Sequence, residues 1–128
     1  MKCPNIIVVE DDDAIRDTIR EVLELEGYTV QAFPNGKTAL DALSHCEAPC
    51  LILLDLMMPV MNGWEFLEAR KACGDTIVAI PVYIVSAVAE RGELQGIGAS
   101  GYIKKPIDID LLLGVVTKYC GANQQQVA

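Results

Sequence analysis

Short apolar runs and longer amphipathic stretches alternate along the chain. The runs are rich in Val, Ile and Leu and stop at charged or turn-forming residues, which is typical of strands. In the stretches between them, apolar side chains recur every three or four residues, as on one face of a helix. The pattern predicts five strands, at residues 5–9, 28–33, 51–54, 80–85 and 101–104. It predicts five helices, at residues 13–26, 36–46, 64–71, 90–98 and 109–120.

The run at 51–54 has four apolar residues with no alternation, and it ends at Asp55. Such a run suits a strand that is covered on both faces, as in a parallel sheet. Strands that alternate with helices along a chain form doubly wound sheets with right-handed crossovers. We therefore expect an α/β fold in one domain, residues 1–120, followed by a flexible polar tail at 121–128.

Polar side chains directly follow four of the predicted strands. Glu10 and Asp11 follow the first strand, Asp55 the third, Ser86 the fourth and Lys105 the fifth. A lone aspartate at a strand end is about as often a helix or turn cap as a functional group. The carboxyl ends of parallel strands, however, share the edge where open α/β sheets bind ligands. The sequence therefore predicts one site that combines acidic, hydroxyl and basic groups.

This combination of groups suits phosphoryl transfer. Carboxylates held together repel one another, and a hard divalent cation such as Mg²⁺ relieves the repulsion. Asp55 would be the nucleophile and form an acyl phosphate, while Lys105 and Ser86 bind the arriving group. The sequence has no Gly-rich phosphate loop, so we do not expect ATP to be the direct donor.

Composition narrows the class of partner. The 128 residues are 52% hydrophobic and 22% charged, as in a folded globular domain. The net charge of −8 argues against direct nucleic-acid binding, which needs a basic patch. The chain has neither a membrane-length apolar run nor a signal-peptide pattern, so we expect a cytoplasmic protein without membrane insertion.

The cysteine pattern predicts free thiols. The five cysteines are odd in number and lack paired CxxC spacing, which disfavours both disulfides and a zinc site. They are Cys3, Cys46, Cys50, Cys73 and Cys120.

Four segments together resemble the receiver domain of two-component response regulators. They are Val8-Val9-Glu10-Asp11-Asp12, Asp55-Leu56-Met57-Met58-Pro59 with Asn62-Gly63, Val85-Ser86-Ala87, and 98–106, which ends in Lys104-Lys105-Pro106. Their order and spacing, over residues 5 to about 120, make the resemblance specific. It implies a flavodoxin-like sheet of order 2-1-3-4-5 and a signalling protein, not an enzyme, whose catalysis is limited to its own phosphorylation and dephosphorylation.

The resemblance also implies roles for individual residues. Asp55 is the phosphoacceptor, and Mg²⁺ is held by Asp11, Asp55 and the main-chain carbonyl of Met57, with Glu10 helping through water. Ser86 and Tyr102 are switch residues that respond to the phosphoryl group, and the Lys105–Pro106 bond is cis. The implied phosphoryl donor is a sensor histidine kinase or a histidine phosphotransfer protein. A downstream protein target reads the switched surface, and the sequence is also compatible with a homodimer.

The chain departs from the family pattern in two places. The segment from Ser86 to Lys105 is shorter than is usual in the family by about one helical turn, so we expect a changed output surface. Met57 and Val88, two residues beyond Asp55 and Ser86, are apolar where polar side chains can orient an attacking water. We therefore predict slow self-dephosphorylation.

Two other functions remain open from the residues. A haloacid-dehalogenase-like phosphohydrolase also forms an aspartyl phosphate, but such enzymes carry a second aspartate at the position of Met57. A receiver-like adapter that binds proteins without being phosphorylated is disfavoured because every expected polar group is present.

Overall fold

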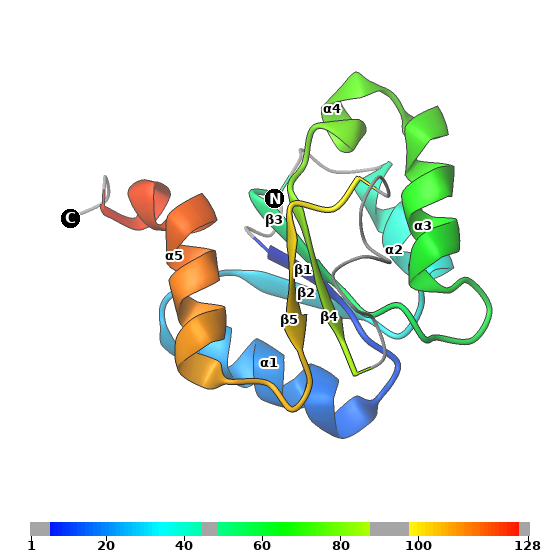
Figure 1. Ribbon diagram of the computed structural model, residues 1–128. Coiled ribbons are helices and arrows are strands. Elements are labelled where there is room, and N and C mark those ends of the chain that lie inside the picture. The colour runs from blue at the N-terminus through cyan, green and yellow to red at the C-terminus, as the bar shows by residue number, and fades with distance from the viewer. Residues whose placement is uncertain (1–5, 45–48, 88–97, 126–128) are drawn as a thin grey trace.

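The computed structural model describes residues 6–44, 49–87 and 98–125. Its centre is a parallel sheet of five strands in the order β2-β1-β3-β4-β5 (Figure 1). The strands are β1 (Ile6–Val9), β2 (Val30–Phe33), β3 (Leu51–Leu54), β4 (Val82–Ser86) and β5 (Gly101–Lys104). The flavodoxin-like α/β fold and its strand order are thus confirmed, with β2 and β4 each beginning two residues later than predicted.

The register of the central strands sets the positions of the first polar residues beyond them. β1 pairs with β3 so that Val9 lies opposite Leu54. Glu10 and Asp55 are the next residues on these neighbouring strands, and the Asp55 N–H donates to the carbonyl of Val9. The two carboxylates therefore leave the sheet side by side at its carboxyl edge.

Helices cover both faces of the sheet (Figure 1). On one face α1 (Asp13–Leu25) and α5 (Ile109–Gln125) bury Ile19, Leu23, Leu112 and Val116 against Ile6, Val8, Leu51 and Leu53. On the other face α2 (Gly36–Leu43) and α3 (Gly63–Ala69) bury Ala39, Leu43, Phe66 and Leu67 against Ile7, Val9, Ile52 and Leu54. Alternate residues of the central strands thus enter opposite cores, which explains why the runs are apolar throughout.

Side-chain caps begin two of the helices. Asp12 caps α1 by accepting a hydrogen bond of 3.0 Å from Ile15 N–H, and Gly27 follows that helix at φ 94°. Asn62 caps α3 in a reciprocal arrangement with Glu65. These contacts satisfy N–H groups that the first helical turn leaves free.

The helices differ from the prediction after α3 and at the end of α5. After α3 the chain forms a 3₁₀ turn, η1 (Arg70–Cys73), and a short helix, α4 (Asp75–Val78), which has too few residues to show a period in sequence. The helix predicted at 90–98 lies mostly outside the described residues. The tail, predicted to be unstructured from Gly121, is helical as far as Gln125, since Ala and Gln are good helix formers. The boundary of the domain itself stays a prediction.

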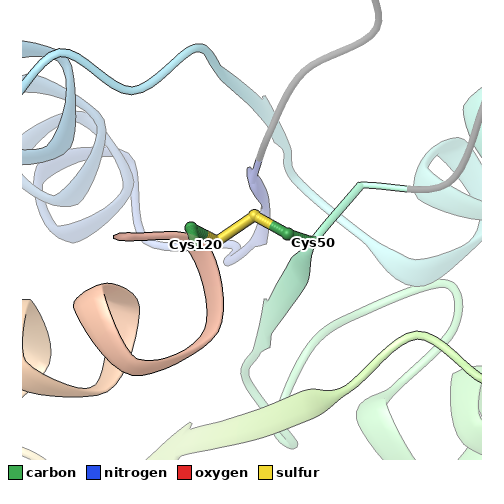
Figure 2. The surroundings of a disulfide bond; sticks show 2 residues. All are labelled: Cys50 and Cys120. Carbon is green, nitrogen blue, oxygen red and sulfur yellow. A yellow bond between two sulfur atoms is a disulfide. The ribbon is translucent and has the colours of Figure 1, made fainter. Parts of the chain in front are cut away.

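The prediction of free thiols is wrong for two cysteines. Cys50 and Cys120 form a disulfide that joins the start of β3 to α5 (Figure 2). They are 70 residues apart, so their proximity follows from the packing of α5 on the sheet and not from any local spacing. Cys73 is a free, exposed cysteine, while Cys3 and Cys46 lie outside the described residues. Within the described part of the chain, no helix is long and apolar enough to span a bilayer.

Candidate functional site

The polar residues that follow the strands line one cleft at the carboxyl edge of the sheet. The cleft has a volume of about 290 Å³. It is lined by Glu10, Asp11, Asp12, Ile15, Asp55, Met57, Ser86, Ala87 and Lys105. The structure therefore brings together the acidic, hydroxyl and basic groups that the sequence placed at four strand ends, while their chemical roles stay predictions.

Three carboxylates in the cleft could hold a metal ion. One oxygen from each of Glu10, Asp11 and Asp55 lies within 4.8 Å of the others. Glu10 and Asp55 are buried and Asp11 is exposed, so the cluster opens to solvent on one side. Hard oxygen ligands around a partly open position suit Mg²⁺, which keeps several waters when it binds protein. The residues present therefore fit this ion.

Lys105 is the positive charge at the centre of the cluster. Its Nζ lies 2.7 Å from Oε1 of Glu10 and 3.6 Å from Oδ2 of Asp55. The side chains of Lys105 and Glu10 are 15% and 2% exposed, so their salt bridge is largely shielded from water. A second cation would relieve the remaining negative charge, because one ammonium faces three carboxylates.

Burial dominates the ionisation of the two inner carboxyl groups. It raises the pKa of Glu10 from 4.5 to about 7, with Lys105 opposing the rise and the charge of Asp55 adding to it. Burial likewise raises the pKa of Asp55 above 3.8, while the charge of Lys105 opposes this. For Lys105, burial alone would lower the pKa, but contacts with Glu10 and Asp55 raise it above 10.5, so the ammonium stays charged.

The loop after β3 supports Asp55 from its own main chain. Met57 N–H donates to Oδ1 of Asp55 at 3.3 Å, which orients the carboxylate. The Met57 side chain is 56% exposed, on the solvent side of this loop. A Cβ at Gly63 would lie 2.6 Å from the main-chain oxygen of Asp55, so a glycine is required for α3 to begin this close.

Arg16 is a site residue that the sequence reasoning missed. From α1 its guanidinium donates to the main-chain oxygen of Glu10 at 2.9 Å and pairs with Asp13 at 2.5 Å. It therefore fixes the β1–α1 turn that presents Glu10 and Asp11. The available signal was the spacing of Asp13 and Arg16, one helical turn apart.

The two predicted switch residues occupy different surroundings. Ser86 ends β4, is buried, and lines the cleft. Tyr102 lies on β5 and packs, half buried, against the core that α2 and α3 cover. Lys105–Pro106 is a cis peptide, as the resemblance implied.

An apolar groove lies directly beside the cleft and shares Lys105 and Ile15 with it. Its volume is about 380 Å³. It runs between α1 and the β5–α5 connection and is lined by Ala14, Ile15, Thr18, Ile19, Lys105, Pro106, Ile107 and Ile109.

Comparison with known sequences agrees with this fold. Residues 6–117 match the family model of the response regulator receiver domain. The chain is 33% identical over 108 residues to the response regulator MprA of Mycolicibacterium vanbaalenii, covering 84% of this chain and 46% of that protein. It is 36% identical over 118 residues to an uncharacterised 14.6 kDa protein of Leptolyngbya boryana, covering 91% and 89%. The chain thus spans about half the length of the regulator MprA and most of the shorter protein.

Solved structures give the same result. The chain superposes on the chemotaxis protein CheY4 of Vibrio cholerae with a TM-score of 0.79 and 26% identity, covering 89% of this chain and 96% of that one. A receiver domain of a signal transduction histidine kinase from Syntrophus aciditrophicus gives a TM-score of 0.80 and 27% identity, covering 94% and 92%. The chain belongs to the response regulator receiver family, so it is a signalling receiver domain of two-component systems.

Proposed function

We propose that Asp55 accepts a phosphoryl group, in a Mg²⁺-dependent reaction, from a sensor histidine kinase or a histidine phosphotransfer protein. The observation that supports this most is the setting of Asp55: a buried carboxylate, beside two further carboxylates and the Lys105 ammonium, in a cleft open on one side. A buried ion pair that served stability alone would not need three carboxylates around one ammonium.

In the proposed reaction an oxygen of Asp55 attacks phosphorus, the bond between phosphorus and the donor histidine nitrogen breaks, and an acyl phosphate forms. Asp11, Asp55 and the main-chain carbonyl of Met57 would hold Mg²⁺, with Glu10 acting through water. When bound, this ion neutralises charge on the phosphoryl oxygens. Lys105 and Ser86 would contact the same oxygens, Lys105 by charge and Ser86 by its hydroxyl.

The groove beside the cleft is where we place the donor protein. A phosphohistidine must approach Asp55 through the open side of the cleft, and the groove continues from that side along α1. Its apolar lining offers area to bury, while the shared Lys105 faces the phosphoryl group. The net charge of −8 leaves direct nucleic-acid binding outside the proposal.

The acyl phosphate would change what the domain binds. Phosphorylation adds negative charge between Ser86 and Lys105, and Ser86 and Tyr102 would rearrange in response. A downstream protein would bind the altered surface. We propose no turnover of an external substrate beyond phosphorylation and dephosphorylation of the domain, and a cytoplasmic location.

The proposal is tested by incubation with Mg²⁺ and acetyl phosphate, followed by intact-mass spectrometry. We expect one added phosphoryl group, absent after EDTA treatment. Asp55→Asn should abolish the gain, and its matched control is Asp17→Asn, which changes an exposed carboxylate on α1 away from the cleft lining and should leave the gain intact. No gain under conditions where Mg²⁺ binding is measured by calorimetry, with both acetyl phosphate and a kinase-coupled donor, would instead favour the adapter function.

A further inference from the structure

The Cys50–Cys120 disulfide lies at the end of the sheet opposite the cleft. Cys50 directly precedes β3 and Asp55 directly follows it, so the length of the strand separates the disulfide from the carboxylate. Figure 2 shows the bond joining the start of β3 to α5. The Cα atoms are 5.7 Å apart, a separation that accommodates the bond without movement of the backbone.

The two cysteines differ in how deeply they are buried. Cys120 is 1% exposed and belongs to the core between the sheet and the helices α1 and α5. Cys50 is only partly buried, at the edge of that core. An external thiol or disulfide can therefore reach the sulfur of Cys50 more readily than that of Cys120.

The disulfide holds the far end of the helix that begins beside the cleft. α5 starts at Ile109, which lines the apolar groove together with Lys105. Toward its other end, Cys120 fixes the helix to β3. Among the described residues, α5 is also held on the sheet by apolar contacts such as those of Leu112 and Val116, and by the edge-on ring contact of Tyr119 with Tyr83.

We propose that Cys50 and Cys120 form a reversible thiol–disulfide exchange site, at which small thiols and disulfides of the glutathione class control how firmly α5 is held on the sheet. In the opening direction, a thiolate attacks Sγ of Cys50, the bond between the cysteine sulfurs breaks, and Cys120 leaves as a thiolate that takes up a proton. A second thiolate then attacks the mixed disulfide at the external sulfur, which frees Cys50 and releases the oxidised small disulfide. Closure is the reverse, with the small disulfide as the oxidant.

The burial of Cys120 makes the exchange depend on motion of α5. A thiolate that leaves into an apolar core is disfavoured, so the step requires the end of the helix to open first. The reduced chain in turn loses a cross-link that closes a span of 70 residues, and such cross-links stabilise mainly by restricting the unfolded chain. The proposal is independent of whether Asp55 is phosphorylated.

The test equilibrates the full chain in buffers of defined ratios of reduced to oxidised glutathione, traps free thiols with iodoacetamide, and maps peptides by mass spectrometry. We expect a linked peptide that joins Cys50 to Cys120 in oxidising buffer and is lost in reducing buffer. Reduction should lower Tm by roughly 10 °C. It should also speed amide hydrogen exchange in the second half of α5 more than in α2.

Two variants keep the test specific. Cys50→Ala removes the partly buried partner, so its Tm should be the same in oxidising and reducing buffer. Because both values come from one variant, any change in packing caused by the substitution cancels. Cys73→Ala, at the exposed free cysteine, should keep the full redox shift. The proposal is overturned if no linked peptide forms at any ratio, if the link resists every reducing ratio, or if Tm and exchange in α5 do not depend on the link.

Discussion

Lys105 Nζ lies closer to Glu10 than to Asp55, at 2.7 Å from Oε1 of Glu10 against 3.6 Å from Oδ2 of Asp55. The ammonium is thus paired chiefly with the carboxylate that we do not expect to react. The two oxygens of Asp55 have different neighbours: Oδ1 accepts a hydrogen bond from Met57 N–H at 3.3 Å, and Oδ2 is the oxygen near Lys105. Lys105 therefore lies near Asp55 but neutralises the charge of Asp55 only in part.

The pKa of Glu10 predicts how the stability of the metal-free protein depends on pH. Burial raises this pKa from 4.5 to about 7, so the folded state binds a proton more tightly than the unfolded chain does. The contribution of Glu10 to stability is therefore greatest below about pH 4.5 and is lost as pH rises through 7. We measure the free energy of unfolding by urea, in EDTA, between pH 5.5 and 8. It should fall less steeply with rising pH in Glu10→Gln than in the wild type. Equal slopes for the two proteins would contradict the assignment.

The same pKa predicts competition between protons and Mg²⁺. Below pH 7 protonated Glu10 withdraws one negative charge from the cluster, so Mg²⁺ affinity should drop as pH falls from 8 to 6. Calorimetric titration with MgCl₂ measures this directly. Glu10→Gln should bind more weakly at pH 8 and show a flatter pH dependence, whereas Asp17→Asn, an exposed change on α1, should match the wild type.

Met57 predicts the lifetime of the phosphorylated state. Its exposed side chain cannot orient a water molecule for attack on an acyl phosphate at Asp55. Met57→Asn adds an amide at this position, and one added hydrogen bond of ~1 kcal/mol in the transition state would speed decay about fivefold. The decay of phosphorylated protein after removal of the donor, followed by intact mass, gives the rate. Met57→Leu is the matched control, and an unchanged rate in Met57→Asn would refute the role of this position.

The backbone conformation of Val60 predicts that a glycine at this position would stabilise the protein. Its φ of 69° lies in the left-handed region, which is costly for a β-branched residue, and Met61 N–H donates to the carbonyl of Pro59 across it. The side chain is 74% exposed, so little burial is lost on its removal. Val60→Gly should therefore raise the free energy of unfolding by about 1 kcal/mol. Val60→Leu, which keeps a Cβ, should gain clearly less in the same urea unfolding experiment, and a destabilised Val60→Gly would show that the turn is not strained.

Arg70 joins the segments that enter the last two strands. Its guanidinium is buried and donates to the carbonyls of Ile80 and Gly98, each at 3.0 Å, and burial lowers its pKa. Arg70→Met keeps the apolar stem but leaves two acceptors without these donors, so it should cost about 2–4 kcal/mol. In Arg70→Lys the ammonium can donate well to only one of the two carbonyls, so this variant should recover only part of the lost free energy of unfolding. A loss below about 0.5 kcal/mol in Arg70→Met would contradict the linking role.

The strands and the polar residues after them could be predicted because their signals are local. An apolar run that stops at Asp55 or Ser86 gives both the strand and its end, and parallel pairing then places such ends at one edge. The Cys50–Cys120 bond and the contact of Arg70 with Gly98 join residues that are far apart in sequence. Such contacts leave no local sequence pattern, so they could not be predicted. The short helix Asp75–Val78 was missed because four residues contain barely one helical turn.

The most direct test of the central claim is to identify the phosphorylated residue. After reaction with Mg²⁺ and acetyl phosphate, reduction with borohydride converts an aspartyl phosphate to homoserine, and peptide mass spectrometry locates the converted residue. The account predicts conversion at Asp55, none at Asp11 or Asp12, and none in Asp55→Asn or in the presence of EDTA. Conversion at another carboxylate, or a phosphoryl group that survives in Asp55→Asn, would contradict it.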